Sequence, residues 1–581
     1  MTRPRPARRI PHSELPAAWI HTLRERRKPV TRAEATRARQ FVDRSGVLPL
    51  ITHALDAHRK SPAGRPRTVT IQALFVGMTL ASWRAQGRVV LADVADLLAQ
   101  QLPASIRTQL ALPAWPDDVD GFEAAYLAVR RAFHAVERVM DPSPLPKRRI
   151  KRTDAAALEA GADQSDLDRR RALLVEVTNR ILEASLAPAR PLIDEYWEGA
   201  VAVDATPVRT FSAGVHPGTE HTATDPDAAW YVRDGNHRDP SDTTDGRKAK
   251  KSRRSLFGYE TTLAVLGDTT PASDLPPELR LPALALAFTV HKPGHDPAGN
   301  ALTALKDMAR RRYRPGRLAA DRAYSSSQPV TFHIPVHDLG YQPIWDYRRD
   351  QLGIQGTHAG ALLVDGTWYC PHIPKPLITA TADYLAQKID RTTWRHRVDA
   401  RPAYRLRPKA APDARGARRL LCPAAGTHPT AACPVKPRSL GRDPRLIPVD
   451  PAPTPGGHPE VCVRESLTFH RDTGIRFWQE LEHARPDWVR LYFHLRNRVE
   501  HFNQYAKDHE ALERSRTRRV RGIAAQSILL AFQLAHANHR KLAAWLDTLQ
   551  SATQPARRRP TNRRTPNNPH DWTPKRHSHN P

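Results

Sequence analysis

The chain has 581 residues, enough for roughly two to four domains of about 100–200 residues each. It contains 90 Lys and Arg against 60 Asp and Glu, and the net charge of +30 favours a polyanionic partner, either nucleic acid or an anionic membrane. No segment reaches the roughly 18 consecutive apolar residues of a membrane-spanning helix, and the N-terminus lacks the apolar segment of a secretory signal. Four cysteines are too few for a secreted disulfide framework, so we expect a nucleic-acid-binding protein of the reducing cytosol.

The first third of the chain is predicted to be helical. After a basic opening, apolar residues recur at helical spacing over five segments, 17–27, 69–85, 91–102, 121–140 and 167–186. None of these segments has a convincing helix-turn-helix spacing. We therefore expect residues 1–195 to form a helical region that is either a DNA-binding module or a scaffold.

Residues 196–325 have the pattern of a mixed sheet with helices. The predicted elements are three strands, a helix and a short fourth strand, at 199–208, 256–266, 281–292, 300–312 and 315–324. A loop with the basic run RKAKKSRR separates the first two strands, and Asp296 is expected to start the helix. Two strands are predicted to end at an aspartate, the first at Asp204 and the fourth at Asp321.

The remaining sequence is predicted to form three segments. Residues 326–484 are Pro-rich with short strand-like pieces, which predicts a β-rich insertion. Residues 485–550 contain two strong helices, at 488–512 and 521–549, the second of which closes the core. Residues 551–581 are basic and rich in Pro and Asn, which predicts a disordered tail.

Asp204 and Asp321 each follow a short apolar run. Considered singly, such a residue is more often a cap or a turn residue. Side chains at strand ends, however, lie where neighbouring loops converge, and a sheet of this order can bring the first and fourth strands side by side. Two converging carboxylates can hold a hard divalent cation such as Mg²⁺.

A third acid, Glu500, lies on the long helix at 488–512. At 100° per residue, it shares a stripe about 80° wide with four other side chains, Phe493, Arg496, Asn503 and Lys507. Arg496 and Glu500 are spaced for a solvated i, i+4 ion pair. The alternative is a metal-binding glutamate with cations beside it that hold phosphates.

The segment Arg496-x3-Glu500-x6-Lys507 resembles the Tyr-x2-Arg-x3-Glu-x6-Lys signature of DDE transposases, in the insertion-sequence group with a β-rich insertion before the final glutamate. VAVDATPV and AADRAY resemble the segments around that family's first and second catalytic aspartates, Asp204 and Asp321 here. The signature's tyrosine position is Phe493, and the nearest tyrosine, Tyr492, lies one residue early. The resemblance covers residues 199–325 and 488–550.

This resemblance implies an α/β fold, α+β overall, in which an RNase H-like mixed sheet is flanked by helices. It implies a transposase that cleaves phosphodiester bonds at the ends of a mobile element and joins the 3′-OH ends to target DNA, with two Mg²⁺ or Mn²⁺ ions. The implied catalytic and metal-binding residues are Asp204, Asp321 and Glu500. The partner is double-stranded DNA, bound by a homodimer, and the location is the bacterial cytoplasm, in association with the nucleoid. The expected DNA-binding residues are Arg496, Lys507, Phe493, Tyr324, Lys250 and Lys251.

Two other functions stay open from the sequence. One is a metal-dependent DNA nuclease of the same fold, and the other is a catalytically inactive basic DNA-binding protein whose acids are structural.

Two further groups lie in the insertion. The cysteines, with His372 and His428 nearby in sequence, are either ordinary reduced thiols or ligands of a structural zinc, although no Cys-x2-Cys pair is present. Trp345 and Trp368 either pack in the core or stack on a flipped base. The four cysteines are Cys370, Cys422, Cys433 and Cys462.

Overall fold

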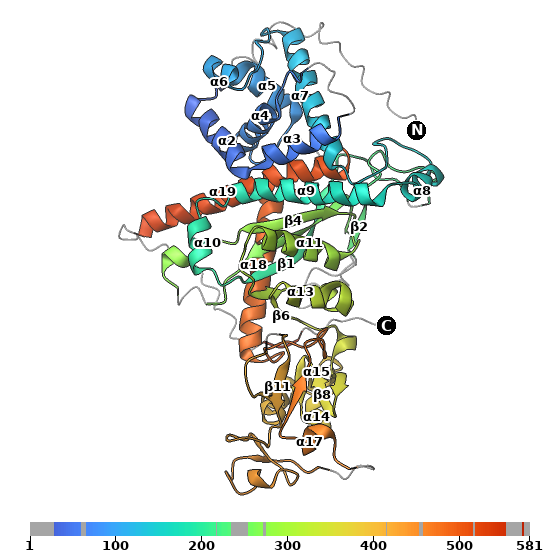
Figure 1. Ribbon diagram of the computed structural model, residues 1–581, viewed down its shortest axis with the longest axis vertical. Coiled ribbons are helices and arrows are strands. Elements are labelled where there is room, and N and C mark those ends of the chain that lie inside the picture. Colours follow the sequence, from blue (N-terminus) through green and yellow to red (C-terminus); the bar gives the residue numbers. More distant parts are fainter. Residues whose placement is uncertain are drawn as a thin grey trace, which may run out of the picture.

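The computed structural model describes residues 28–59, 66–216, 218–233, 254–270, 275–413, 415–451, 457–514, 518–552 and 572–574. The molecule is elongated, with a helical region at one end, a mixed sheet in the middle and a β-rich region at the other end (Figure 1). The prediction of a mixed α/β fold is thereby confirmed. None of the helices in the described part of the chain has both the length and the hydropathy needed to span a lipid bilayer.

The N-terminal helices pack around α4, which is buried along almost its whole length. Four of the predicted segments are confirmed in α4, α5 with the following π-helix, α7 and α9, whereas segment 17–27 lies outside the described residues. The bounds are α2 Arg32–Ser45, α3 Val47–Ala57, α4 Ile71–Arg84, α5 Leu91–Asp96, the π-helix Leu97–Gln101, α6 Ala104–Gln109, α7 Val119–Met140, α8 Arg152–Ala160, α9 Gln164–Ala184 and α10 Arg190–Tyr196.

The central sheet has six strands in the order β2-β3-β1-β5-β6, with β4 also paired to β3. Strand β3 is antiparallel to β1, β2 and β4, whereas β5 is parallel to both β1 and β6. The bounds are β1 Val201–Arg209, β2 Ala229–Arg233, β3 Arg254–Leu266, β4 Ala285–His291, β5 Arg317–Ala319 and β6 Gln342–Ile344. The predicted helix after β4 is α11, Pro297–Arg310, and Asp296 caps it by accepting a hydrogen bond from the Gly299 N–H.

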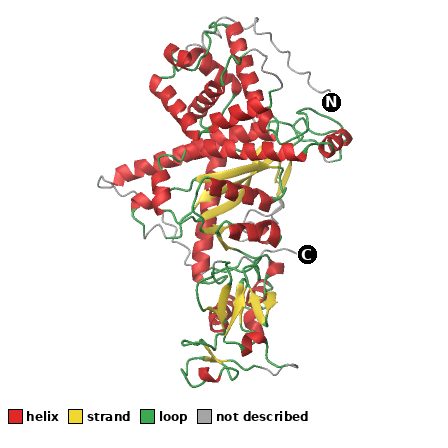
Figure 2. Cartoon of the chain, in the orientation of Figure 1, coloured by secondary structure: helices red, strands yellow, loops and turns green. Residues whose placement is uncertain are grey.

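Helices cover both faces of this sheet (Figure 2). Ala202 of β1 lies on the face that packs against α18, Pro486–His509, and α19, Ile523–Ala552. Val201 and Val203 lie on the opposite face, against α11 and α13, Ile334–Asp338. The N-terminal helices share one hydrophobic core with α18, α19 and the first face, so the described helices α2 to α9 do not form a separate domain.

The predicted boundary at residue 325 is too early. Strand β6 pairs with β5, and the segment leading to it, α12 (Arg322–Ser325), the π-helix Pro329–His333 and α13, packs against the core. These elements have only three to five residues, too few for a recognisable hydrophobic period.

The insertion contains helices as well as the expected strands. Its strands form three small sheets, β7 Ile354–His358 with β8 Ala361–Val364 and β9 Thr367–Tyr369, β10 Arg407–Pro408 with β11 Arg418–Leu421 and β14 Ser466–Phe469, and β12 Ala431–Ala432 with β13 Ile447–Pro448. Its helices, which the sequence analysis did not predict, are α14 Lys375–Ile378, α15 Ala380–Leu385, α16 Arg391–Ala400 and α17 Glu460–Val463.

Part of the predicted disordered tail is folded against the core. The ring of Trp572 lies 5.6 Å from Trp488 of α18 and 6.0 Å from Trp394 of α16, measured between ring centroids. Arg395 of α16 donates a hydrogen bond to the Trp572 carbonyl at 2.9 Å. The prediction is wrong for residues 572–574, and the other residues after 552 lie outside the described structure.

Candidate functional site

Two of the predicted acids lie on neighbouring parallel strands. Val201 and Ala202 of β1 pair with Leu318 and Ala319 of β5, so the adjacency expected for the first and fourth strands is confirmed. Continuing this register by two residues in both strands places Asp204 beside Asp321, whose backbone is still extended (φ −77°, ψ 177°). Because Ala202 and Ala319 face α18, both carboxylates also lie on that face of the sheet.

The expectation that β1 ends at Asp204 is wrong. The strand continues to Arg209, because its other neighbour, β3, pairs with it along the whole length. Asp321 lies two residues after the end of β5, and its Oδ1 accepts a hydrogen bond from the Ala323 N–H at 2.8 Å, which caps α12. Asp204 therefore lies within the sheet but at the end of its pairing with β5.

The third predicted acid, Glu500, comes from α18 and is connected to Asp204 through an arginine. The Arg496 Nη1 lies 3.5 Å from Asp204 Oδ1, and its Nη2 lies 3.2 Å from Glu500 Oε1. Arg496 Nη1 also donates to the Val203 carbonyl at 3.2 Å. The i, i+4 ion pair considered from the sequence is present, but it belongs to a larger arrangement that includes Asp204.

Two polar residues of α18 that received no role from the sequence also reach this site. Asn503 Nδ2 donates to Asp204 Oδ2 at 3.0 Å, while its own buried Oδ1 has no hydrogen-bond partner. The Tyr492 hydroxyl donates to the carbonyl of Ala320, next to Asp321, at 3.4 Å. The position of Asn503 on the same helix stripe as Glu500 could have indicated that it reaches the site. For Tyr492 the sequence showed only that a tyrosine lies one residue before the tyrosine position of the signature.

The Asp204 carboxyl is held in an unfavourable environment for its charge. Burial raises its pKa, Arg496 opposes this shift, and the carboxylates of Asp321 and Glu500 raise the pKa further. Its side chain is 18% exposed, whereas that of Glu500 is 56% exposed. The site thus combines a buried carboxyl with two like charges, an arrangement more common at functional sites than in structural ion pairs.

Tyr324 of α12 lies beside the two aspartates. Burial raises the pKa of its hydroxyl well above the ordinary value, and the charges of Asp204 and Asp321 add to this effect. The hydroxyl oxygen is buried and has no hydrogen-bond partner. With the ring 2% exposed, Tyr324 cannot contact DNA unless α12 moves.

The other expected DNA-binding residues make different contacts or lie outside the described residues. Lys507 pairs with Glu513 at 3.5 Å. Phe493 packs against Tyr492 and Trp572, at centroid distances of 5.2 and 5.6 Å. Lys250 and Lys251 lie outside the described residues.

The donor atoms of this site suit a hard divalent cation. No three His, Cys, Asp or Glu side chains in the described ranges are arranged closely enough to enclose a metal ion as they stand. Asp204, Asp321 and Glu500 nevertheless supply only carboxylate oxygens, the ligands that Mg²⁺ and Mn²⁺ accept. Their mutual repulsion, which raises the pKa of Asp204, is the kind of unfavourable energy that a bound cation would relieve.

A second polar group, centred on Glu260 of β3, lies on the opposite face of the sheet from Asp204. Burial raises the pKa of Glu260, and the charge of Asp321 adds to this shift. Glu260 accepts a hydrogen bond from the Gly294 N–H at 2.9 Å and lies 3.9 Å from His291. His291 in turn contacts the hydroxyl of Thr262 at 2.9 Å. Through the hydrogen bond to Gly294, this group holds the loop before α11 near Asp321.

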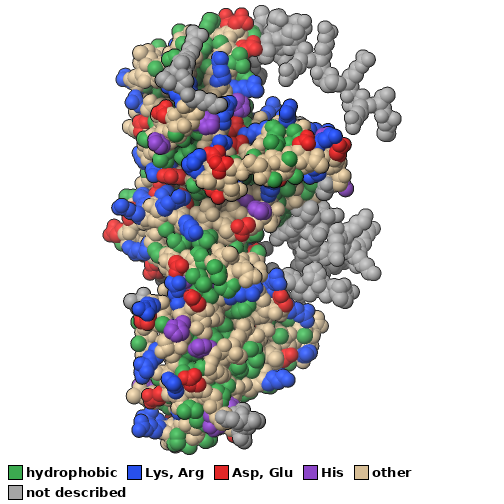
Figure 3. All heavy atoms as spheres, turned by 45° about the vertical axis from the view of Figure 1, so that its right-hand side comes forward, with side chains coloured by type: hydrophobic (Ala, Val, Ile, Leu, Met, Phe, Trp, Pro, Cys, Tyr) green, Lys and Arg blue, Asp and Glu red, His purple; other side chains and the backbone are tan. Residues whose placement is uncertain are grey.

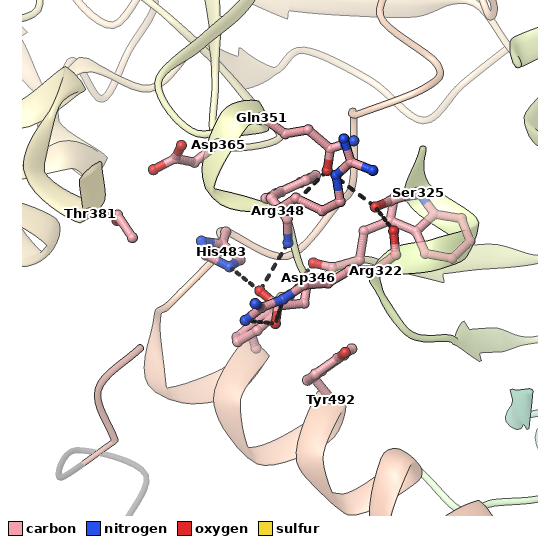
Figure 4. A network of polar contacts seen from close by, with 12 residues as sticks. Arg322, Ser325, Asp346, Arg348, Gln351, Asp365, Thr381, His483 and Tyr492 are labelled. Atoms are coloured by element: carbon pink, nitrogen blue, oxygen red, sulfur yellow. Dashed lines mark hydrogen bonds and ion pairs between the residues drawn. The ribbon is translucent and has the colours of Figure 1, made fainter. Parts of the chain in front are cut away.

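A hydrogen-bond network attaches the segment after Asp321 to the start of α18 (Figure 4). Asp346, just after β6, accepts hydrogen bonds from Arg322 of α12 at 2.7 Å and contacts His483 at 3.2 Å. Burial alone would raise the pKa of Asp346, but these two partners outweigh it and lower the pKa. In the same network, Ser325 donates to Gln351 at 3.3 Å.

Basic side chains are spread along the molecule rather than gathered only at the acidic site. Figure 3 shows Lys and Arg on the visible face at every level, with acidic side chains among them. A hollow of about 650 Å³ lies along α7, the loop after it and α9, far in the sequence from the three acids. Its basic lining residues are Arg130, Arg131, Arg138, Lys147 and Arg170.

Both tryptophans considered for base stacking are core residues. Trp345 is fully buried against Phe332, at a centroid distance of 6.1 Å, and Trp368 is 3% exposed, 4.9 Å from Phe469. The packing alternative is therefore confirmed for both residues.

Comparison of the chain with protein-family models, with curated proteins and with solved structures gives no match.

Proposed function

We propose that this chain is a DDE-type transposase with an RNase H-like core, which cleaves element ends and joins their 3′-OH groups to target DNA. The observation that carries the proposal is the register of β1 and β5, which sets Asp204 beside Asp321 on the face packed by the Glu500 helix. A mixed sheet covered by helices on both faces, with a long insertion before the last acid, agrees with the resemblance of the sequence motifs.

Each residue has a role in this proposal. Asp204, Asp321 and Glu500 hold the cations, with Asp204 fixed by the hydrogen bond from Asn503. When bound, two divalent ions supply activation of the attacking water or 3′-hydroxyl and stabilisation of the leaving oxygen. Arg496 orients Asp204 and Glu500 through its two terminal nitrogens, and in this proposal its positive charge would also attract the DNA phosphate held at the site.

DNA binding requires more surface than this site offers. The net charge of +30 and the hollow along α7 and α9, whose lining has five Lys and Arg against Glu137 and Asp141, support phosphate contacts by the N-terminal helical region. In this proposal the helical region binds DNA and also buttresses α19, since it shares a core with that helix. The proposed assembly is a homodimer, because two element ends must be brought together.

The test is an assay that separates the possible reactions. The purified chain is incubated with Mg²⁺, with labelled DNA from the two flanks of its own gene and with a plasmid target. Joined products support a transposase, cleavage without joining indicates a metal-dependent nuclease, and binding without cleavage indicates a DNA-binding protein.

Glu500→Gln is the decisive variant, because it keeps the shape of the side chain and removes a ligand charge. The matched control is Asp508→Asn, two turns further along α18, where the carboxylate is exposed and bonded to Gln504. Cleavage at the normal rate by Glu500→Gln would contradict the proposal, whereas the control should cleave like the wild type.

A further inference from the structure

The insertion brings together four cysteines from distant parts of its sequence. All four are buried and none forms a disulfide. Three directly follow short strands, and the fourth belongs to α17, just before β14. We refer to them as the four-cysteine cluster, which consists of Cys370 after β9, Cys422 after β11, Cys433 after β12 and Cys462 in α17.

The thiols of the cluster are within reach of one another. The Cys370 and Cys462 thiols lie close enough to shift each other's pKa, upwards for Cys370 and downwards for Cys462, and the His372 side chain also lowers the pKa of Cys462. Cys422 lies near enough to both Cys433 and Cys462 for their charges to interact. Cys370, Cys422 and Cys433 also belong to one buried cluster, and Cys462 belongs to the cluster adjoining it.

Three of the cysteines have the same local structure. Each is followed by a proline, and each carbonyl accepts a hydrogen bond from the N–H three residues later, at 3.1 Å for Cys370, 2.9 Å for Cys422 and 2.9 Å for Cys433. Such a turn directs the side chain away from the preceding strand. The sequence contains no Cys-x2-Cys pair, so this repeated Cys-Pro turn is visible only once the hydrogen bonds are known.

Backbone N–H groups point at two of the sulfur atoms. The His372 N–H donates to the Cys370 sulfur, and the Ala424 N–H donates to the Cys422 sulfur, in both cases from two residues after the cysteine. N–H donors of this kind stabilise a thiolate, and they hold a sulfur in the direction that a metal ligand requires. A thiol that only fills apolar space needs no such donors.

The apolar cores of the insertion are small. Its three sheets have strands of two to five residues, and its buried apolar residues fall into three small clusters, two of which adjoin at Val435. Small β-rich units of this kind commonly need a disulfide or a metal, because a core of that size contributes too little stability by itself.

We propose that the four-cysteine cluster binds one structural Zn²⁺ through four thiolates. Four protons leave to solvent as the ion binds, and no oxidation takes place. As placed, the thiols do not enclose an ion, so binding requires the side chains to move until four sulfur atoms lie about 2.3 Å from the metal. The proposal is independent of the function proposed for the acidic site.

The test begins with elemental analysis of the full chain, purified without a histidine tag under reducing conditions and dialysed against a weak chelator. The wild type should carry about one zinc per chain. Replacing the zinc with Co²⁺ should produce the intense visible absorption of tetrahedral thiolate coordination. Wild-type protein that has neither zinc nor this absorption after addition of Co²⁺ would overturn the proposal.

Variants then locate the ion. The double variant Cys422→Ser with Cys433→Ser should lose the zinc, whereas Asp204→Asn and His428→Ala should retain it, because His428 is exposed in the loop between two of the cysteines. Retention of zinc by the double variant would contradict the assignment. If the double variant does not fold, a mercurial that titrates the thiols of the wild-type chain should release zinc in step with thiol modification.

Discussion

Asp204 and Asp346 are two largely buried aspartates on either side of Asp321, one on β1 and the other just after β6, and they differ in how their charge is balanced. Asp346 has two basic partners, Arg322 and His483, and they lower its pKa in spite of burial. Asp204 shares Arg496 with Glu500 and lies beside Asp321, and its pKa is raised. The fold satisfies one carboxylate completely and leaves the other with excess negative charge around it.

This difference separates a structural acid from a candidate catalytic one. Removing one partner of a structural ion pair lowers the stability of the fold. A charged group in an electrostatically unfavourable position, by contrast, indicates a functional role. Asp346 positions α12 and therefore Asp321, and Asp204 is proposed to hold a cation. Substitutions at the two positions should consequently affect different measurements.

The largest effect is expected for Asp204→Asn. It removes a charge from the proposed cation site, so cleavage of element ends should fall by on the order of 10³-fold or more. Metal-free stability, measured by urea unfolding, should stay equal or rise, because the variant relieves repulsion with Asp321 and Glu500. A large loss of stability without loss of cleavage would remove the distinction between the two aspartates.

The next effect is expected for Asp346→Asn. It leaves Arg322 and His483 without their carboxylate, so the free energy of unfolding should fall by about 2–3 kcal/mol. Urea unfolding at neutral pH checks this value. Asp350→Asn is the control, since Asp350 is exposed and pairs only with neighbouring Arg348 in the described structure, and it should change stability little.

A smaller effect is expected for Arg496→Lys. An ammonium cannot reach Asp204, Glu500 and the Val203 carbonyl together, so cleavage should slow by about 10- to 100-fold and need more Mg²⁺. Mg²⁺ titrations of the cleavage rate measure both changes. The matched control is Arg498→Lys on the same helix, whose side chain contacts Asp268 and Leu281 instead. An equal change in Mg²⁺ requirement for the control would refute the role of Arg496.

The smallest effect concerns the pH dependence of the scaffold that carries both aspartates. Burial lowers the pKa of His333 to about 4, against an ordinary value of 6.5. Between about pH 6.5 and pH 4, His333 binds a proton in the unfolded chain but not in the folded chain. The free energy of unfolding therefore falls as the pH falls from about 6.5 to about 4. Between pH 7 and pH 5, His333 should account for about 1–2 kcal/mol of that loss. In His333→Leu the loss measured by urea unfolding should shrink by this amount, and an unchanged profile would contradict the assignment.

The sequence predicted the parts of the fold that have long, regular patterns. Helices α7, α9, α18 and α19 were found within a few residues of their ends, because many turns of apolar spacing support each of them. The short elements β6 and α12 were missed, since three or four residues carry no period. The boundary of the insertion was misplaced for the same reason.

The candidate site was predictable residue by residue but not as an arrangement. The sequence singled out Asp204, Asp321, Arg496 and Glu500, and the stripe on α18 included Asn503. It did not indicate that Arg496 would connect two acids, because that contact depends on how α18 crosses β1. Contacts between residues nearly 300 positions apart, such as Asn503 with Asp204 at a separation of 299, leave no local pattern.

The packing of Trp572 against α16 and α18 has a consequence for how the chain folds during its synthesis. The aromatic cluster at the start of α18 contains Trp488, Phe493 and Trp394, and it closes only when Trp572 arrives. During synthesis, the start of the proposed catalytic helix must therefore keep one flank open until residue 572 has emerged from the ribosome. The packing around the start of this helix is thus completed late in biogenesis, after all three acids have been translated.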